Sequence, residues 1–152
     1  MKRTLCGIIA IIMMLSTLPF PCLAEDSASE DIVTYYEDGS YTIECIYEMQ
    51  SRSPGTKTGV KEKTHYSSSG QACWKLVVNG TFTYANGVPI CRSSTCSVTI
   101  YDSAWYTISK SASKNGASAI AYVTMGQNVL GVTVKEVSTT VTLTCDGNGN
   151  LS

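Results

Sequence analysis

The sequence is poor in histidine, which many metal sites and catalytic sites require. It has one histidine, His65, among 152 residues, which excludes a site with several histidine ligands. Charged residues make up only 15% of the chain and the formal net charge is −1. This composition indicates neither a highly charged disordered chain nor a nucleic-acid-binding protein. The length of 152 residues and the hydrophobic content of 43% are typical of one ordinary domain.

The start of the chain has the pattern of a secretory signal. Lys2 and Arg3 precede an apolar run over residues 5–18, and small Ala24 stands directly before an acidic stretch. This order predicts a signal peptide at residues 1–24 and a secreted, extracellular protein. The apolar run is shorter than the roughly 20 residues that span a bilayer. An uncut signal anchor and a lipid anchor on Cys22 are the two alternatives.

The charge behind the predicted cleavage site is uneven. Residues 25–38 hold six acidic residues and no basic residue, whereas residues 39–152 hold nine basic and six acidic residues. We therefore expect an acidic flexible leader at 25–38, followed by a single domain at 39–152. A second interpretation is that the leader folds over a basic surface of the domain and masks it.

The domain has the period-two pattern of β-strands. Apolar residues alternate with polar ones over residues 41–50, which predicts a strand whose apolar face, including Cys45, is buried. Residues 60–66 are polar and lysine-rich, which is typical of an edge strand. The pair Asn79-Gly80 suggests a hairpin turn, but a turn there would place Phe82 on the solvent face. A continuous strand over 74–84 keeps the aromatic residues on one side.

Further strands are expected along the rest of the chain, with a turn at Gly126. They are predicted at residues 96–101, 105–109, 118–125, 129–136 and 137–145. The fold class is therefore all-β: an antiparallel β-sandwich of about seven to nine strands, immunoglobulin-like or similar, and disulfide-bearing.

The chain has seven cysteines, and five remain after removal of residues 1–24. Disulfides are expected because cysteines in an exported chain favour them over zinc, and because no C-x-x-C pair is present. Cys91–Cys145 is the pairing that we choose, since it closes a long loop between strand ends. Cys91–Cys96 is the rival pairing. Because the number is odd, one thiol is left over or pairs between chains. The five cysteines are Cys45, Cys73, Cys91, Cys96 and Cys145.

Catalytic, cofactor and metal sites are not indicated. His65 is expected to be a solvated edge residue, and Glu44 and Glu48 share what we take to be the outward face of one strand. Asp146 begins a stretch that resembles a calcium loop, but a glycine-rich turn is the favoured interpretation. One of Trp105 and Tyr106 must point outward, where it would be a possible exposed aromatic contact for a sugar or a protein; core packing is the alternative that we favour.

Three stretches resemble a known family. They are G-x-x-x-W-K-L-x-V-x-G-x-F-T-Y at 70–84, the segment 91–116 with I-Y-D-S-A-W and S-A-S-K-N-G, and V-T-L-T-C with G-N-L-S at 141–152. Together they resemble short secreted proteins of Gram-positive, clostridia-like bacteria whose function is unassigned. The likeness covers about residues 57–152. It implies cysteines at the places of Cys91 and Cys145, and it implies no enzyme.

The leading functional hypothesis is a non-catalytic extracellular binding or interaction module. Its partner would be a glycan, an envelope component or a protein, with no nucleic acid involved. A secreted toxin or bacteriocin-like protein is the alternative, and an enzyme comes third because the scattered carboxylates and single histidine offer no evident site. Fold class alone does not choose among these.

Overall fold

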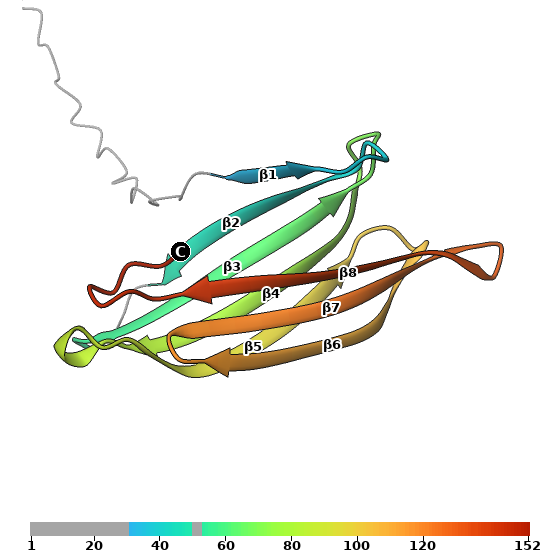
Figure 1. Cartoon of the computed structure of the whole chain (residues 1–152). Coiled ribbons are helices and arrows are strands. Elements are labelled where there is room, and N and C mark those ends of the chain that lie inside the picture. Colours follow the sequence, from blue (N-terminus) through green and yellow to red (C-terminus); the bar gives the residue numbers. More distant parts are fainter. Residues whose placement is uncertain (1–30, 50–52) are drawn as a thin grey trace, which may run out of the picture.

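The computed structural model describes residues 31–49 and 53–152, and in this part of the chain it forms two antiparallel sheets (Figure 1). The five-stranded sheet contains β1 (Ile32–Tyr35), β2 (Tyr41–Met49), β3 (Thr56–Tyr66), β4 (Ala72–Thr83) and β5 (Ile90–Ile100), in that order. The three-stranded sheet contains β6 (Trp105–Asn115), β7 (Ser118–Val129) and β8 (Val132–Thr144). The all-β class is confirmed. Within each sheet, strands that are consecutive in sequence pair with each other, so the sheets are meanders and differ from the Greek-key connections of an immunoglobulin domain.

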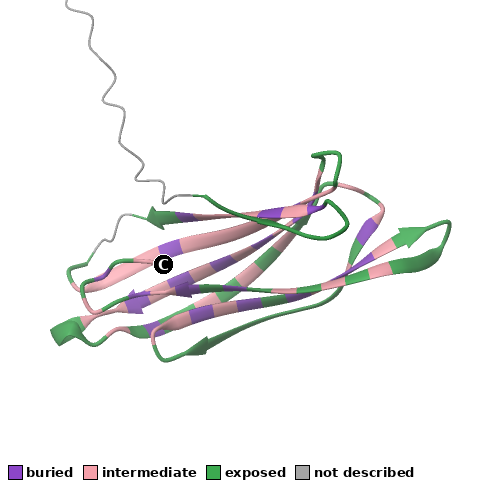
Figure 2. Ribbon diagram, turned by 45° about the horizontal axis from the view of Figure 1, so that its top comes forward, coloured by how far each residue is buried: buried purple, intermediate pink, exposed green. Residues whose placement is uncertain are grey.

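The core lies between β4 and the strands β7 and β8 that face it. Alternate residues of β4 point inward and are fully buried, and alternate residues of β7 meet them, as the regular bands of buried residues show (Figure 2). Each fully buried large apolar side chain contributes about 1.5–3 kcal/mol. The main core residues are Trp74, Leu76, Val78, Phe82, Ala119, Ala121, Val123, Met125, Val141 and Leu143.

The continuous strand through Asn79-Gly80 is confirmed. Gly80 pairs with Gly59 of β3 on one side and with Ser94 of β5 on the other. A glycine is required because the ring of Phe82 folds back over this position. A Cβ at residue 80 would lie 2.6 Å from that ring.

The N-terminal part of the domain differs from the expected flexible leader. Ile32–Tyr35 forms strand β1, which pairs with β2 in a regular antiparallel register. The predicted signal peptide at 1–24 and the first part of the leader, up to residue 30, lie outside the described residues. No helix in the described part of the chain has the length and hydropathy needed to cross a membrane.

Two predictions about β2 and β3 are wrong. The apolar face of β2 is the outer one, with Tyr47 and Met49 exposed, whereas Thr42 and Glu44 point toward the three-stranded sheet. Strand β3 is the central strand of its sheet and not an edge strand. Its lysines misled the prediction, because Lys63 points inward and pairs with Glu44.

The predicted turn at Gly126 is also wrong. Strand β7 runs through Gly126 to Val129, and the turn falls at Leu130-Gly131. Residues 132–144, which were divided between two predicted strands, form the single strand β8. Gly126 lies within the strand because the ring of Tyr106 covers it. A Cβ there would lie 2.5 Å from that ring. The resulting β7–β8 hairpin is long and projects past the other strands, to the right in Figure 1.

The predicted disulfides are absent from the described residues, where all five cysteines are free thiols. Cys91 and Cys145 both approach the β6–β7 turn, since their N–H groups donate to Gly116 and Ala117 respectively. Their thiols nevertheless turn to different carbonyls: Cys91 Sγ lies 3.2 Å from Ser93 O, and Cys145 Sγ lies 3.5 Å from Asp146 O. The rival pairing of Cys91 fails because the extended strand β5 separates it from its partner by about 16 Å.

Candidate functional site

A cavity opens at one end of the molecule, where the β1–β2 turn faces β8. Its volume is about 350 Å³. A smaller hollow of about 160 Å³ adjoins it, shares four of its lining residues and reaches Trp105. The volume of the larger cavity matches the lower end of small-molecule sites. We call it the His65 cavity, and its lining residues are Tyr36, Glu37, Asp38, Ser40, His65, Lys135 and Val137.

His65 is the most unusual residue of this cavity. It is only 2% exposed, and its ring stacks on Trp74 at a centroid distance of 5.1 Å and an interplanar angle of 17°. Trp105 meets it edge-on at 5.5 Å. The prediction of a solvated histidine is therefore wrong. The physical reason is that β3 is the central strand of its sheet. Its last residues therefore lie under β8 and beside two tryptophans.

Buried nitrogen atoms in this cluster lack hydrogen-bond partners. Within the described residues, no partner is found for His65 Nδ1 or Trp74 Nε1, and Trp105 Nε1 has only the thiol of Cys73 as a weak acceptor. An unpaired buried polar group costs about 1–3 kcal/mol, and such groups are rare in native proteins. His65 and Trp105 both line the smaller hollow, so their rings form part of its wall.

The imidazole of His65 is neutral at physiological pH. Burial is the main cause that lowers its pKa from the ordinary value of 6.5, and the positive charge of Lys135 lowers it further, while Asp38 acts in the opposite direction. A neutral imidazole carries one N–H and one acceptor nitrogen. The residue therefore offers directional hydrogen bonding without a charge.

The rim of the cavity carries one ion pair, between Asp38 and Lys135. Asp38 also accepts from the Ser40 backbone N–H at 3.0 Å and from Ser40 Oγ at 2.5 Å. These contacts, with that of Lys135 the largest, hold the pKa of the Asp38 carboxyl well below its usual range. The pair ties the β1–β2 turn to β8, so charges of both signs are engaged with each other at the rim.

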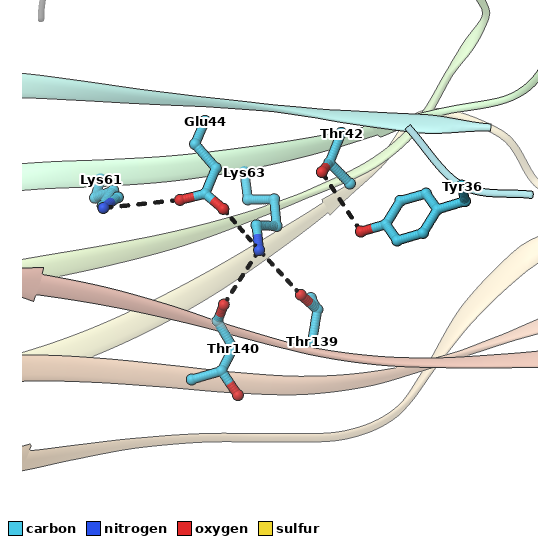
Figure 3. Close-up of polar contacts among 7 residues, drawn as sticks. All are labelled: Tyr36, Thr42, Glu44, Lys61, Lys63, Thr139 and Thr140. Carbon is cyan, nitrogen blue, oxygen red and sulfur yellow. Dashed lines mark hydrogen bonds and ion pairs between the residues drawn. The ribbon is translucent and has the colours of Figure 1, made fainter. Parts of the chain in front are cut away.

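The β1–β2 turn places Tyr36 as one wall. Backbone bonds from Tyr36 N to Ser40 O and from Gly39 N to Tyr36 O close the turn, and Gly39 takes the positive φ of +78° that it requires. Tyr36 Oη lies 3.5 Å from Thr42 Oγ1, which orients the ring along β2 (Figure 3). The sequence offered no signal for this wall, because Tyr36 fell in the segment expected to be flexible.

A polar cluster lies beside the cavity between the two sheets (Figure 3). Glu44 forms ion pairs with Lys63 at 2.8 Å and with Lys61 at 3.7 Å. Lys63 Nζ also donates to Thr139 Oγ1 at 3.3 Å and to Thr140 O at 3.4 Å, both on β8. The cluster therefore links β2, β3 and β8 where an apolar core would otherwise be needed.

The carboxylates considered as catalytic candidates are engaged with other groups. Glu44 and Glu48 do share a face of β2, but Glu44 belongs to the inner cluster, and Glu48 pairs with Lys57 at 2.5 Å. Asp146 accepts from the backbone N–H groups of Asn148 and Asn150 within its own turn. Among the residues that the structure describes, no three His, Cys, Asp or Glu side chains are placed to hold a metal ion.

The predicted aromatic pair is divided between the two faces of β6. Trp105 points inward, is 5% exposed and belongs to the core beside His65. Tyr106 points outward, is 37% exposed, and its hydroxyl lies 2.6 Å from Thr133 Oγ1. The pair was expected to split in this way, and the structure shows which member lies on each side.

The fold and the site together define a two-sheet, all-β protein with a small, partly apolar cavity at one end. Comparison of the chain with protein-family models, with curated proteins and with solved structures finds no match. Functional inference therefore depends on the residues of the site.

Proposed function

We propose that the protein is an exported, non-catalytic binding module whose His65 cavity holds a small uncharged ligand rich in hydroxyl or carbonyl oxygens, such as a sugar unit of an extracellular glycan. The observation that carries this proposal is His65, a buried and neutral imidazole that lines both adjoining hollows and whose Nδ1 has no hydrogen-bond partner among the described residues. Export rests on the signal pattern of residues 1–24.

The chemistry of the lining supports this ligand class. The neutral imidazole of His65 carries one N–H donor and one acceptor nitrogen, which match the hydroxyl and carbonyl oxygens of such a ligand. His65 is neutral, and the charges of Asp38 and Lys135 are paired with each other. The carboxylate of Glu37 is the other charge of the lining, and it disfavours an anionic ligand. Tyr36 gives an aromatic wall and Val137 an apolar one, which suit the flat apolar face of a sugar ring.

A non-catalytic role is supported by the state of the acidic groups. A carboxyl that acts as a general acid needs a pKa raised toward the working pH and must lie within reach of the substrate. Asp38 is the acidic group at the rim whose pKa is shifted, and its shift is downward, which keeps it ionised and paired with Lys135.

Binding can be tested by calorimetry and by nuclear magnetic resonance titration. The panel would contain neutral monosaccharides and disaccharides, an N-acetylated sugar, a uronic acid and an amino sugar. We expect the neutral and N-acetylated sugars to bind, and His65→Phe to weaken binding at least tenfold while it retains the stacking on Trp74. Tyr122→Phe is the matched control, since Tyr122 is exposed and bonds to Ser138 away from the cavity.

Two results would overturn the assignment. One is the absence of binding to every neutral sugar in the panel. The other is equal affinity in the wild-type protein and His65→Phe. Export is tested separately by sequencing the N-terminus of protein recovered from the culture medium, where we expect it to begin at Glu25.

A further inference from the structure

The end of the β7–β8 hairpin is apolar and exposed. Leu130 is 100% exposed, Val132 64%, Val134 57% and Val129 48%. We call residues 129–132 the hairpin tip. Both ribbon views show the hairpin reaching beyond the rest of the molecule, with the tip coloured as exposed (Figures 1 and 2).

The backbone of the tip makes this leucine more unusual. Val129 pairs with Val132, so Leu130 and Gly131 form a two-residue loop, with positive φ angles of +52° and +85°. Two positive φ angles define the type I′ hairpin turn, whose first position favours Asn, Asp or Gly. A leucine there is unfavourable both for the left-handed backbone and for contact with water. Neither folding nor solubility explains the residue, which indicates a binding role.

The surroundings of the tip are uncharged. Residues 127–134 contain no Asp, Glu, Lys or Arg. The next residue, Lys135, is paired with Asp38. Tyr106 stands back from the tip on β6, where it covers Gly126 and bonds to Thr133. The arrangement is an aliphatic end, then a tyrosine, and then polar residues.

We infer that the hairpin tip inserts shallowly into the surface of a lipid bilayer and anchors the protein there peripherally. Aliphatic side chains partition favourably into hydrocarbon, and tyrosine is enriched at the membrane–water interface, where Tyr106 would lie. Shallow insertion leaves the carbonyl groups of the turn among the lipid headgroups, where they remain hydrated. Each buried methylene strengthens such binding in the way that a lipid chain does.

A pocket on another protein fits these observations less well. Leu and Val are under-represented among the residues that dominate protein–protein binding, whereas Trp, Tyr and Arg are enriched. The tip consists of Val129, Leu130, Gly131 and Val132 and has none of these three types. Its convex shape and lack of charge also give no feature by which one partner would be selected.

The experiment is flotation with vesicles of pure phosphatidylcholine. The protein would lack residues 1–24, because the apolar run at 5–18 would itself bind lipid, and every described residue is retained. Wild-type protein should float with the vesicles, equally well at low and high salt because no charge is involved. Leu130→Asn should lower the bound fraction at least tenfold and raise the melting temperature, because Asn-Gly suits the turn.

Val88→Asn is the matched control. Val88 is 60% exposed and follows the short 3₁₀ turn η1 (Ala85–Gly87), outside the hairpin, so its replacement should leave flotation unchanged. Leu130→Trp should show a blue shift of its fluorescence on addition of vesicles. Failure of the wild-type protein to float, equal flotation of Leu130→Asn, or tip-dependent capture by a purified protein in the absence of lipid binding would each overturn the inference.

Discussion

His65 shows how one buried side chain sets the response of the protein to pH. Its pKa in the folded protein lies below the ordinary value of 6.5, mainly because of burial. The unfolded chain therefore binds more protons than the folded protein between these two values, and the free energy of unfolding falls as the pH falls below about 6.5. Urea denaturation at pH 7.5, 6.5 and 5.5 should show this loss, and His65→Phe should remove most of it.

The chosen pH range isolates this histidine. Asp38 also has a lowered pKa, but its stabilising contribution is lost only as the pH falls through and below its ordinary value of 3.8. The interpretation would be contradicted if His65→Phe kept the full slope between pH 7.5 and 5.5.

Gly80 is a second residue whose replacement has a defined consequence. A methyl group there would lie 2.6 Å from the ring of Phe82 and 2.9 Å from Cβ of Ala119. We expect Gly80→Ala to destabilise the protein by about 1–3 kcal/mol, the usual result of overpacking a core. Urea denaturation measures the change. In the double variant with Phe82→Leu the two costs should be less than additive, because the clash is removed.

At the scale of the strand, alternation reveals two different faces but not which face is covered. The pattern of β2 correctly predicted a strand, yet its apolar face is the outer one. The polar inner face of β2 and β3 is stabilised by the ion pair of Glu44 with Lys63 and by bonds from Lys63 to β8. These partners are distant in sequence, so no local pattern could indicate that inward-pointing lysines would be paired.

The linkage between the sheets can be tested with Lys63→Met. The lysine side chain is 13% exposed and Glu44 is 19% exposed, so the variant leaves a largely buried carboxylate with one remaining, longer contact to Lys61. We expect the free energy of unfolding to fall by about 1–3 kcal/mol. Lys57→Met is the control. It breaks a more exposed pair with Glu48 and should cost less than about 1 kcal/mol. Equal losses in the two variants would contradict the role given to the inner cluster.

At the scale of the whole molecule, the fold class was predictable and the cavity was not. Period-two patterns identified the strands, and the parity of Phe82 identified the continuous strand through Gly80. The cavity instead joins the β1–β2 turn, His65 on β3 and Lys135 on β8. The cavity forms only when the two sheets pack together. Its lining residues are far apart in sequence, so no local pattern predicts it. The thiol pairing failed for a similar reason, since proximity of strand ends does not fix the direction of side chains.

The thiols give a further prediction for the native protein. Burial raises the pKa of Cys45 to about 11 and also raises the pKa of Cys91 and Cys145, so the thiolate fraction at pH 8 is small. Without reductant, mass spectrometry should show slow alkylation of these three residues in the folded protein and rapid alkylation in urea. A Cys91–Cys145 peptide that remains linked in urea would contradict the free thiols of the structure.

The edge position of β1 in the larger sheet has a consequence for motion. Strand β1 lies at the edge of the larger sheet, pairs only with β2, and all four of its residues are exposed. Such an edge is expected to open locally while the core remains folded. Because the turn that follows β1 carries Tyr36, Asp38 and Ser40, one wall of the His65 cavity would move with it.

Amide hydrogen exchange should therefore be fast at Ile32–Tyr35 and slow along β4 and β7, and a bound sugar should slow the exchange of β1 selectively. Uniform protection of β1 and β4 in the free protein would contradict this. An edge that opens and closes by itself would admit a ligand to a site whose opposite wall stays rigid.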